Sequence, residues 1–205
     1  ISNVVDLINT SLSKMSERRI DAFEASKIDA VDVVFLGDSI THEGMWSEYF
    51  PGVTVLNRGI GGDTTEDLLE RFEGVAALKP AKLFLMIGVN DLNNGGAPDE
   101  IIPRYRDLFD RFDREIPETA IYVQSVLPTN DQWVLPASLK DVRALNDYLK
   151  TEAAARQYQY LDVAALFADA DGTLRKDLSN DGIHLSGDAY PIWRDFVSPY
   201  VEEAL

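Results

Sequence analysis

Five short apolar runs stand out along the chain, and a turn or a segment with helical spacing follows each of them. The runs are rich in β-branched and aromatic residues, which favour strands. Because they show little alternation of apolar and polar positions, they are typical of strands covered on both faces, as in parallel sheets. We predict strands at 31–36, 53–57, 82–88, 120–126 and 158–163.

Helical patterns fill the intervals between the predicted strands. Apolar residues recur at the three- and four-residue spacing of an amphipathic helix, and one segment, 64–78, also has acidic residues in its first turn. We expect a last helix from residue 186 onward, interrupted near Pro191 and Pro199 because proline lacks the N–H that a helix interior needs. The other helices are predicted at 98–115 and 138–156.

The order of these elements predicts the fold class. Strands that alternate with helices form a three-layer α/β domain with right-handed crossovers. No repeat, linker or low-complexity tract divides the chain, and the stretch 93–96 (NNGG) is interpreted as a loop. We therefore expect a single domain over residues 1–205, with residues 1–28 as a helical segment packed on it.

The N-terminal segment has its own apolar stripe at helical spacing. A helix that packs on the domain is the first interpretation, and a helix that binds a partner, a membrane surface or a second copy is the alternative. The segment lacks the basic start and continuous apolar core of a signal peptide, although a presequence removed earlier stays open. The residues of the stripe are Ile1, Val4, Val5, Ile8, Leu12 and Met15.

The amino-acid composition limits which cellular compartment and which classes of binding partner we expect. The 205 residues include no cysteine and carry a formal net charge of −16. Disulfides and a cysteine nucleophile are excluded, which favours a cytoplasmic protein. The charge disfavours nucleic acids and favours neutral or cationic substrates, since the basic pairs 18–19 and 175–176 are isolated among acids and form no basic patch. No apolar run approaches the ~20 residues of a membrane span.

Polar residues and glycines follow the predicted strands at the places where a ligand site is expected. In open α/β sheets, ligands bind beyond the carboxyl ends of the strands. We therefore expect these loops to converge, although each is separate in the sequence. They are 37–39 (GDS), 58–63 (RGIGGD), 88–91 (GVND) and 127–129 (LPT).

Ser39 is the candidate nucleophile in the first of these loops. A serine is a weak nucleophile unless a base takes its proton. The chain has only two histidines, His42 and His184, and His184 follows Asp181 by three residues. That spacing lets the carboxylate orient one imidazole nitrogen while the other faces Ser39, the arrangement of a catalytic triad. His42 stays open as an alternative base, and taken alone Ser39 could be merely a helix cap.

Two further loops supply candidate donors for an oxyanion hole. Gly62 precedes a predicted helix, where backbone N–H groups are unpaired, and Asn90 can offer its side-chain amide. Taken singly, the stretch around Gly62 could be a capped helix start and the stretch around Asn90 an Asx-turn. The succession of such loops at strand ends favours a site for acyl transfer.

These blocks resemble the SGNH hydrolases, also called GDSL-type lipases and esterases. The resemblance rests on Gly37-Asp38-Ser39-Ile40, on Gly62 within 57–63 (NRGIGGD), on Asn90 within 88–91 (GVND), and on Asp181 and His184 within 181–185 (DGIHL). It implies Ser39 as nucleophile, His184 as base, Asp181 as orienting acid, and Gly62 and Asn90 as oxyanion donors. It also implies a five-stranded parallel sheet in flavodoxin-like order. Within the family, the blocks are similar to those of the branch with intracellular platelet-activating-factor acetylhydrolase subunits and lysophospholipase-like bacterial relatives.

The expected activity is that of a serine ester hydrolase with an acyl-enzyme intermediate, acting on short acyl esters of carbohydrates, lipids or other alcohols. The alternatives are an acyltransferase, a lysophospholipase- or thioesterase-like enzyme for longer chains, and a module that binds phosphate or nucleotide at residues 59–65 (GIGGDTT). Asp38, Arg58 and Trp133 are candidate substrate-binding residues. No cofactor or metal is expected, because the acids 169–171 lack the rest of an ion-binding loop. We expect a monomer or homodimer.

Overall fold

A sheet of five parallel strands forms the centre of the molecule, with the strands in the order β2-β1-β3-β4-β5. The computed structural model describes residues 2–26, 28, 31–133 and 136–203, and within the first helix it describes the side chains of residues 10, 11 and 13–25. The α/β class and the flavodoxin-like order are thereby confirmed. The strands are β1 (Val33–Gly37), β2 (Val55–Gly59), β3 (Lys82–Met86), β4 (Ala120–Gln124) and β5 (Gln159–Leu161).

The strand ends differ from the prediction at the glycines. The apolar run of β1 was expected to stop before Gly37, but Gly37 and Gly59 are partners in the ladder and end β1 and β2. A Cβ on Gly37 would lie 2.2 Å from the Met86 carbonyl oxygen and 2.3 Å from the Thr41 hydroxyl. The missing side chain therefore lets the sheet continue up to the turn that carries Ser39.

Long helices occur where the apolar spacing predicts them, and short ones occur where no helical pattern is visible in the sequence. The long ones are α4 (Thr65–Ala76), α6 (Pro98–Glu115) and α7 (Leu139–Ala155). Helices of three to five residues are too short to show a period, so they were not predicted. These are α2 (Ser39–His42), α3 (Trp46–Tyr49), α5 (Val89–Asn93), α8 (Ala164–Phe167) and the 3₁₀ turn η1 (Lys176–Leu178).

The last helix corrects the prediction for residues 186 onward. Helix α9 (Tyr190–Glu202) begins at Tyr190 and runs through Pro199 without interruption. Pro191 lies in the first turn, where an N–H has no helical acceptor. The end of helix α9 beyond Pro199 is bound to strand β3 through Lys82. Lys82 Nζ donates to the carbonyls of Tyr200, Val201 and Glu203 at 2.8, 3.3 and 2.7 Å.

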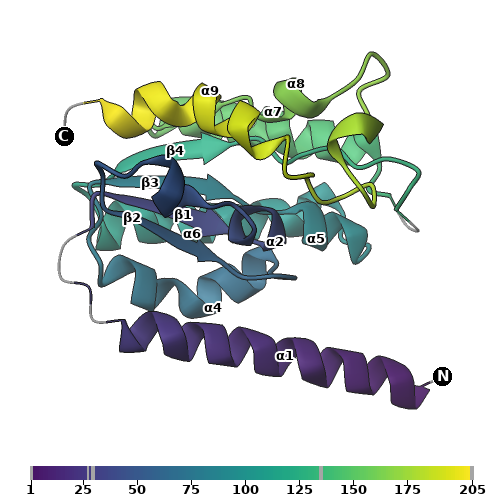
Figure 1. The fold of residues 1–205 in the computed structure, drawn as a ribbon, viewed down its shortest axis with the longest axis horizontal. Helices are drawn as coiled ribbons and strands as arrows, with labels where there is room; N and C mark the ends of the chain where they lie inside the picture. The colour runs from purple at the N-terminus through teal and green to yellow at the C-terminus, as the bar shows by residue number, and fades with distance from the viewer. Residues whose placement is uncertain (1, 27, 29–30, 134–135, 204–205) are drawn as a thin grey trace.

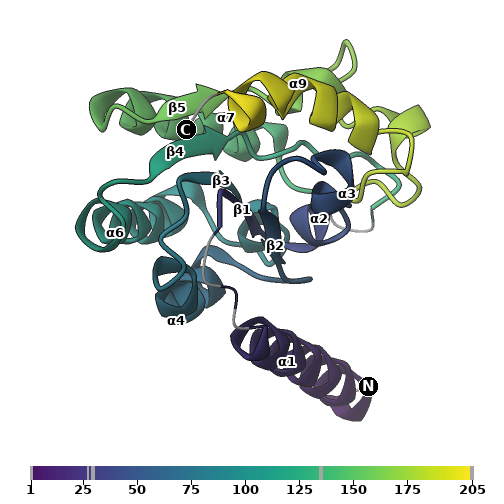
Figure 2. The ribbon, with the colours of Figure 1, turned by 60° about the vertical axis from the view of Figure 1, so that its left-hand side comes forward.

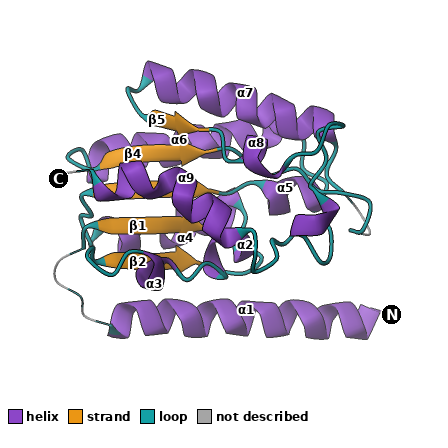
Figure 3. Ribbon diagram, turned by 45° about the horizontal axis from the view of Figure 1, so that its top comes forward, coloured by secondary structure: helices purple, strands orange, loops and turns teal. Residues whose placement is uncertain are grey.

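Helices cover both faces of the sheet. Helix α9 lies over one face, and α4 and α6 lie behind the other (Figure 3). The register places Phe35, Phe84 and Tyr122 side by side on β1, β3 and β4, with ring centroids 4.8 and 4.4 Å apart. Trp46 stacks on Phe35 at 4.0 Å and meets Trp193 edge-on, so both tryptophans belong to the core.

Helix α1 (Ser2–Ala25) lies along the outside of the molecule beside α4 (Figures 1 and 2). Its described contacts with the domain lie in its C-terminal half, where Arg19 Nε donates to the Gly59 carbonyl at 3.0 Å and Phe23 packs beneath the Arg58 guanidinium at 4.3 Å. Met15 is 56% exposed, so the prediction that this side chain packs on the domain is wrong. The other five residues of the predicted stripe lie outside the described side chains. Among the described helices, none is long and apolar enough to cross a membrane.

Replacing Gly37 should destabilise the fold, because a side chain there would clash with the Met86 carbonyl and the Thr41 hydroxyl. We expect Gly37→Ala to lower the free energy of unfolding by ~1–3 kcal/mol, because the new methyl group overpacks a backbone carbonyl. Gly74→Ala is the matched control, since a Cβ there meets nothing within 4 Å and should stabilise helix α4 by ~0.5–1 kcal/mol. Urea unfolding of both variants measures the difference, and equal effects would contradict this account of β1.

Candidate active site

Ser39 begins helix α2 directly after the buried strand β1. Asp38 caps this helix, since its Oδ1 accepts a hydrogen bond from the Ile40 N–H at 2.9 Å. Asn57 holds the other end, because its Nδ2 donates to the carbonyls of Thr41, His42 and Gly44 at 3.0, 2.9 and 2.9 Å. The serine is thereby fixed between a rigid strand and a helix bound at both ends.

A chain of hydrogen bonds joins Ser39 to two residues far along the sequence. His184 Nε2 lies 2.9 Å from Ser39 Oγ, and His184 Nδ1 lies 2.6 Å from Asp181 Oδ2. The other oxygen of Asp181 accepts from the N–H groups of Ile183 and His184 at 2.9 and 2.8 Å. The His184 and Asp181 side chains are 30% and 41% exposed, so the site is open to solvent.

Hydrogen bonding keeps Asp181 in its charged form. Burial acts to raise the pKa of this carboxyl, but the hydrogen bonds from the His184 ring and from the two backbone N–H groups outweigh it and lower the pKa. An ionised Asp181 accepts from Nδ1–H and leaves Nε2 free to accept a proton. The geometry therefore suits a general base at His184.

His42 lies in a different environment from His184. Burial lowers the pKa of His42, and the positive charge of Arg19 lowers it further. Among the described residues, the imidazole within hydrogen-bond distance of Ser39 is that of His184.

The two candidate oxyanion donors, Gly62 and Asn90, lie on loops that are hydrogen-bonded to each other, and the residue before Gly62 approaches Ser39. Gly62 adopts a left-handed conformation (φ +86°) that favours glycine, and a Cβ built on the preceding Gly61 would lie 3.8 Å from Ser39 Cβ. Asn90 Nδ2 donates to the Asp63 carbonyl at 2.9 Å. An amide nitrogen carries two N–H groups, so one remains for a ligand.

A buried ion pair supports this arrangement, and the sequence patterns did not predict it. Arg71 Nε donates to Asp63 Oδ2 at 2.6 Å, with both side chains less than 10% exposed. Arg71 Nη2 donates to the Gly37 and Arg58 carbonyls at 3.1 and 2.9 Å. One guanidinium therefore joins the ends of β1 and β2 to the loop whose carbonyl orients Asn90.

The third loop is fixed to helix α4 in a similar way. Asp91 follows Asn90, and its carboxylate accepts from the N–H and the hydroxyl of Thr65 near the start of α4. Thr64 caps that helix and shares a capping box with Asp67. Asn90 is thus held at its own amide and at the residue that follows it.

The three candidate substrate-binding residues occupy different places. Trp133 is half-buried and meets the His184 ring edge-on, with centroids 6.4 Å apart. Arg58 is 6% exposed and faces helix α1 rather than Ser39. Asp38 is 1% exposed, which corrects the expectation that it contacts substrate directly, because its carboxyl lies beneath the nucleophile.

No metal centre accompanies the site in the described part of the chain. Groups of three or more His, Asp or Glu side chains that could hold an ion are absent there. The Asp169 carboxylate accepts hydrogen bonds from Asp171 and Thr173 within its own loop. Those contacts account for the acidic stretch 169–171 as a turn.

Comparison with known proteins identifies the family. The model of the GDSL-like Lipase/Acylhydrolase family matches residues 35–192, which include Ser39, Gly62, Asn90, Asp181 and His184. The protein belongs to this family and is a carboxylic ester hydrolase of the GDSL type. The resemblance seen in the sequence blocks is therefore confirmed.

Individual relatives agree with this assignment. Platelet-activating factor acetylhydrolase IB subunit alpha2 of Gallus gallus is 29% identical over 167 residues, covering 78% of this chain and 71% of that protein. Subunit alpha1 of Homo sapiens is 28% identical over 178 residues, covering 82% and 75%. A Streptococcus pneumonia structure, whose description names platelet activating factor, has a TM-score of 0.90 at 27% identity and covers 98% of this chain and 99% of its own.

The buried Asp38 should make stability depend on pH. Burial raises the pKa of its carboxyl from 3.8 to about 7, and the negative charges of Asp63 and Asp91 add to that effect. The folded state therefore keeps a proton that the unfolded state releases, so the free energy of unfolding should fall as pH rises from about 4 to about 7. In Asp38→Asn this fall should be smaller, because the amide has no proton to lose.

Urea unfolding at several pH values between 4 and 8 measures this slope. Asp188→Asn, a change at an exposed carboxyl, is the control and should follow the native curve. Equal slopes for Asp38→Asn and the native protein would show that Asp38 is not protonated in the fold.

Proposed function

We propose that the protein hydrolyses short-chain carboxylic esters through an acyl-enzyme formed on Ser39. The observation that carries this proposal is the unbroken chain of hydrogen bonds from Asp181 to His184 to Ser39, at 2.6 and 2.9 Å. Nucleophile, base and orienting acid stand in the order that serine hydrolysis requires.

The reaction has two halves. In the first, His184 Nε2 takes the Ser39 proton while Oγ attacks the ester carbonyl, and His184 then gives this proton to the departing alcohol. In the second, water attacks the acyl-enzyme while His184 takes a proton from the water, and His184 then returns this proton to Ser39 Oγ as the bond to the acyl group breaks and the carboxylic acid leaves. Asp181 stabilises the imidazolium in both halves.

Negative charge develops on the carbonyl oxygen in each half. The backbone N–H groups of Ser39 and Gly62 and the remaining amide N–H of Asn90 are the donors for this oxyanion. The left-handed conformation of Gly62 and the bond from Asn90 to the Asp63 carbonyl support these roles. Preorganised donors need no rearrangement as the charge forms, which is the basis of their large effect on rate.

The acyl group is proposed to be small, of acetyl to butyryl size. The curated relatives remove acetyl groups according to their names, and Trp133 stands at the edge of His184 as a wall for the substrate. An acyltransferase would use the same acyl-enzyme and pass the acyl group to an alcohol other than water. A lysophospholipase- or thioesterase-like enzyme would need room for a longer chain.

Hydrolysis of p-nitrophenyl esters from two to twelve acyl carbons tests the proposal. We expect the highest kcat/KM at two to four carbons and the loss of nearly all turnover in Ser39→Ala, because Ser39 Oγ is the hydroxyl hydrogen-bonded to His184 Nε2 among the described residues. Ser47→Ala, in the exposed part of α3, is the control for a serine outside the site.

The outcomes separate the alternatives. Full activity in Ser39→Ala would exclude the acyl-enzyme proposed here. An optimum at long acyl chains would favour a lysophospholipase-like enzyme. Acylated product formed when glycerol or a sugar is added would identify a transferase.

Asn90→Ala should slow turnover by roughly 10²–10³-fold, because one oxyanion donor is lost. The effect should fall on kcat rather than KM, since the donor acts on charge that is present only in the transition state. Steady-state kinetics with p-nitrophenyl acetate measure both parameters, and an unchanged kcat would remove Asn90 from the oxyanion hole.

A further inference from the structure

A cavity of about 1020 Å³ lies between helices α1 and α4 and extends to the second loop, residues 58–63. Its inner end is formed by Arg58, Gly61, Gly62, Asp63 and Arg71. Gly61 belongs to the cavity and also packs against Ser39. The cavity is therefore separated from the nucleophile by one turn of backbone.

Two arginines, Arg58 and Arg71, line this inner end, and Arg19 lies near Arg58, although the sequence showed no basic patch. Arg19, Arg58 and Arg71 come from α1, β2 and α4, and only folding brings them together. The expectation that basic residues stay isolated is wrong at this place. Burial, together with the charges of Arg19 and Arg71, lowers the pKa of Arg58 to about 10.

The positive charge of the cluster is only partly compensated. Arg71 pairs with Asp63, but among the described residues no carboxylate lies within ion-pair distance of Arg58 or Arg19. The Phe23 ring faces both guanidiniums, at 4.3 Å from Arg58 and 5.0 Å from Arg19. A cation–π contact is a weaker partner for a buried cation than an anion is.

Two of these arginines, Arg58 and Arg71, line the cavity and have guanidinium nitrogens without a hydrogen bond among the described residues. The described hydrogen bond of the Arg58 guanidinium runs from Nη1 to the Asn57 carbonyl at 3.3 Å, which leaves Nε and Nη2 unbonded. Arg71 uses Nε and Nη2, which leaves Nη1. None of these three nitrogens is among the described buried polar atoms that lack a partner, and both residues line the cavity.

The free donors fit a planar anion. The Nε and Nη2 edge of a guanidinium matches the two oxygens of a carboxylate. Acidic side chains occupy the outer rim, so the cavity opposes multiply charged anions more than singly charged ones. These rim residues are Glu17, Glu24, Asp67, Glu70 and Glu73, all exposed.

We propose that the inner end of this cavity is a binding site for a singly charged carboxylate, held by the free edge of Arg58 with Nη1 of Arg71. The carboxylate belongs either to an ester substrate that extends past Gly61 or to a free carboxylic acid. The site goes beyond the esterase activity, since binding at Arg58 does not depend on Ser39.

Binding of sodium butyrate tests the site directly. We expect butyrate to raise the thermal midpoint of the native protein relative to sodium chloride at equal ionic strength, because a ligand of the folded state stabilises it. In Arg58→Gln the apparent dissociation constant should rise by about tenfold or more, since a charge-assisted pair of hydrogen bonds is lost. Arg58→Lys should restore part of the affinity.

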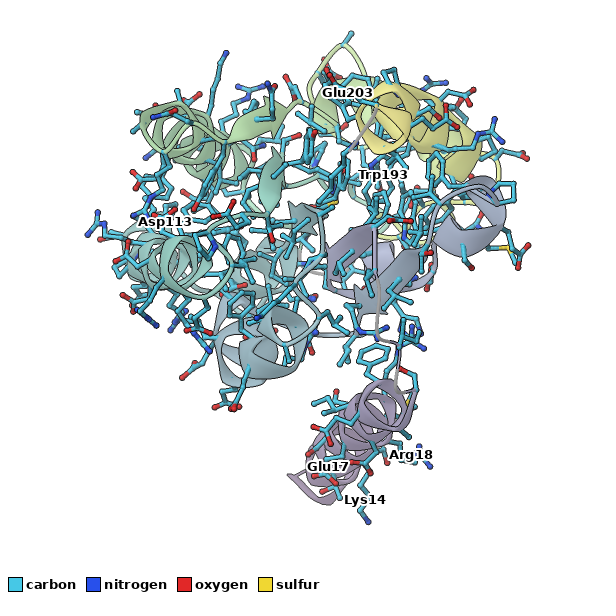
Figure 4. The ribbon with its side chains drawn as sticks, turned by 90° about the vertical axis from the view of Figure 1, so that its left-hand side faces the viewer. Lys14, Glu17, Arg18, Asp113, Trp193 and Glu203 are labelled. Carbon is cyan, nitrogen blue, oxygen red and sulfur yellow. The ribbon has the colours of Figure 1, made fainter. Side chains whose placement is uncertain are left out.

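Arg18→Gln is the matched control, because Arg18 lies next to Arg19 in sequence but points away from the domain (Figure 4). It should bind butyrate as the native protein does. Far-ultraviolet circular dichroism tests whether each variant is folded. If Arg58→Gln does not fold, butyrate binding is compared between Arg58→Lys and the native protein.

A matched pair of esters distinguishes the two sources of the carboxylate. p-Nitrophenyl hydrogen succinate and p-nitrophenyl butyrate have equally long acyl chains, and only the first carries a charge. If Arg58→Gln lowers kcat/KM about tenfold more for the succinate than for the butyrate, the carboxylate is part of the substrate. If the ratio is unchanged while binding of free butyrate depends on Arg58, the site takes a free acid.

Two results would overturn the proposal. One is a native protein that responds to butyrate no more than to chloride. The other is butyrate binding of equal strength in Arg58→Gln and in the native protein. Neither result bears on hydrolysis at Ser39, which the ester series tests separately.

Discussion

The rest of the site depends on the hydrogen bonds that the Arg71 guanidinium donates. This guanidinium bonds to the ends of β1 and β2 and to Asp63, whose own carbonyl orients Asn90. A buried ion pair adds little net stability over an apolar pair of the same shape, but breaking it leaves a buried charge without a partner. The pair therefore acts chiefly on geometry: it fixes the distance between the loop of the nucleophile and the loop of the oxyanion donor.

The sheet supplies the rigid support behind these loops. Phe35, Phe84 and Tyr122 stack across three neighbouring strands, and Trp46 and Trp193 close this face beneath α3 and α9. Close-packed interiors deform little, so a residue at the end of such a strand keeps its position. Ser39 benefits directly, because β1 is wholly buried and the turn that follows has no space for movement at Gly37.

Charge is distributed very unevenly in this acidic protein. Its net charge is −16, yet Arg19, Arg58 and Arg71 meet at one place beside the site. Burial also raises the pKa of Asp38 to about 7 and that of Asp63 to about 6, despite the Arg71 partner of Asp63. Local burial, rather than total charge, therefore determines the electrostatics that a ligand meets near Ser39.

The sequence by itself determined the elements with a strong period and the residues that carry the family blocks. Apolar runs and helical spacing specified all five strands and the long helices, because burial on both faces or on one stripe imposes a pattern on neighbouring residues. Only the tertiary structure decided contacts between distant residues. Whether Ser39 would meet His42 or His184, whether α9 would continue through Pro199, and where Arg58 would find Arg71 depended on how the loops converge. Such contacts impose no period on the sequence, so local patterns do not encode them.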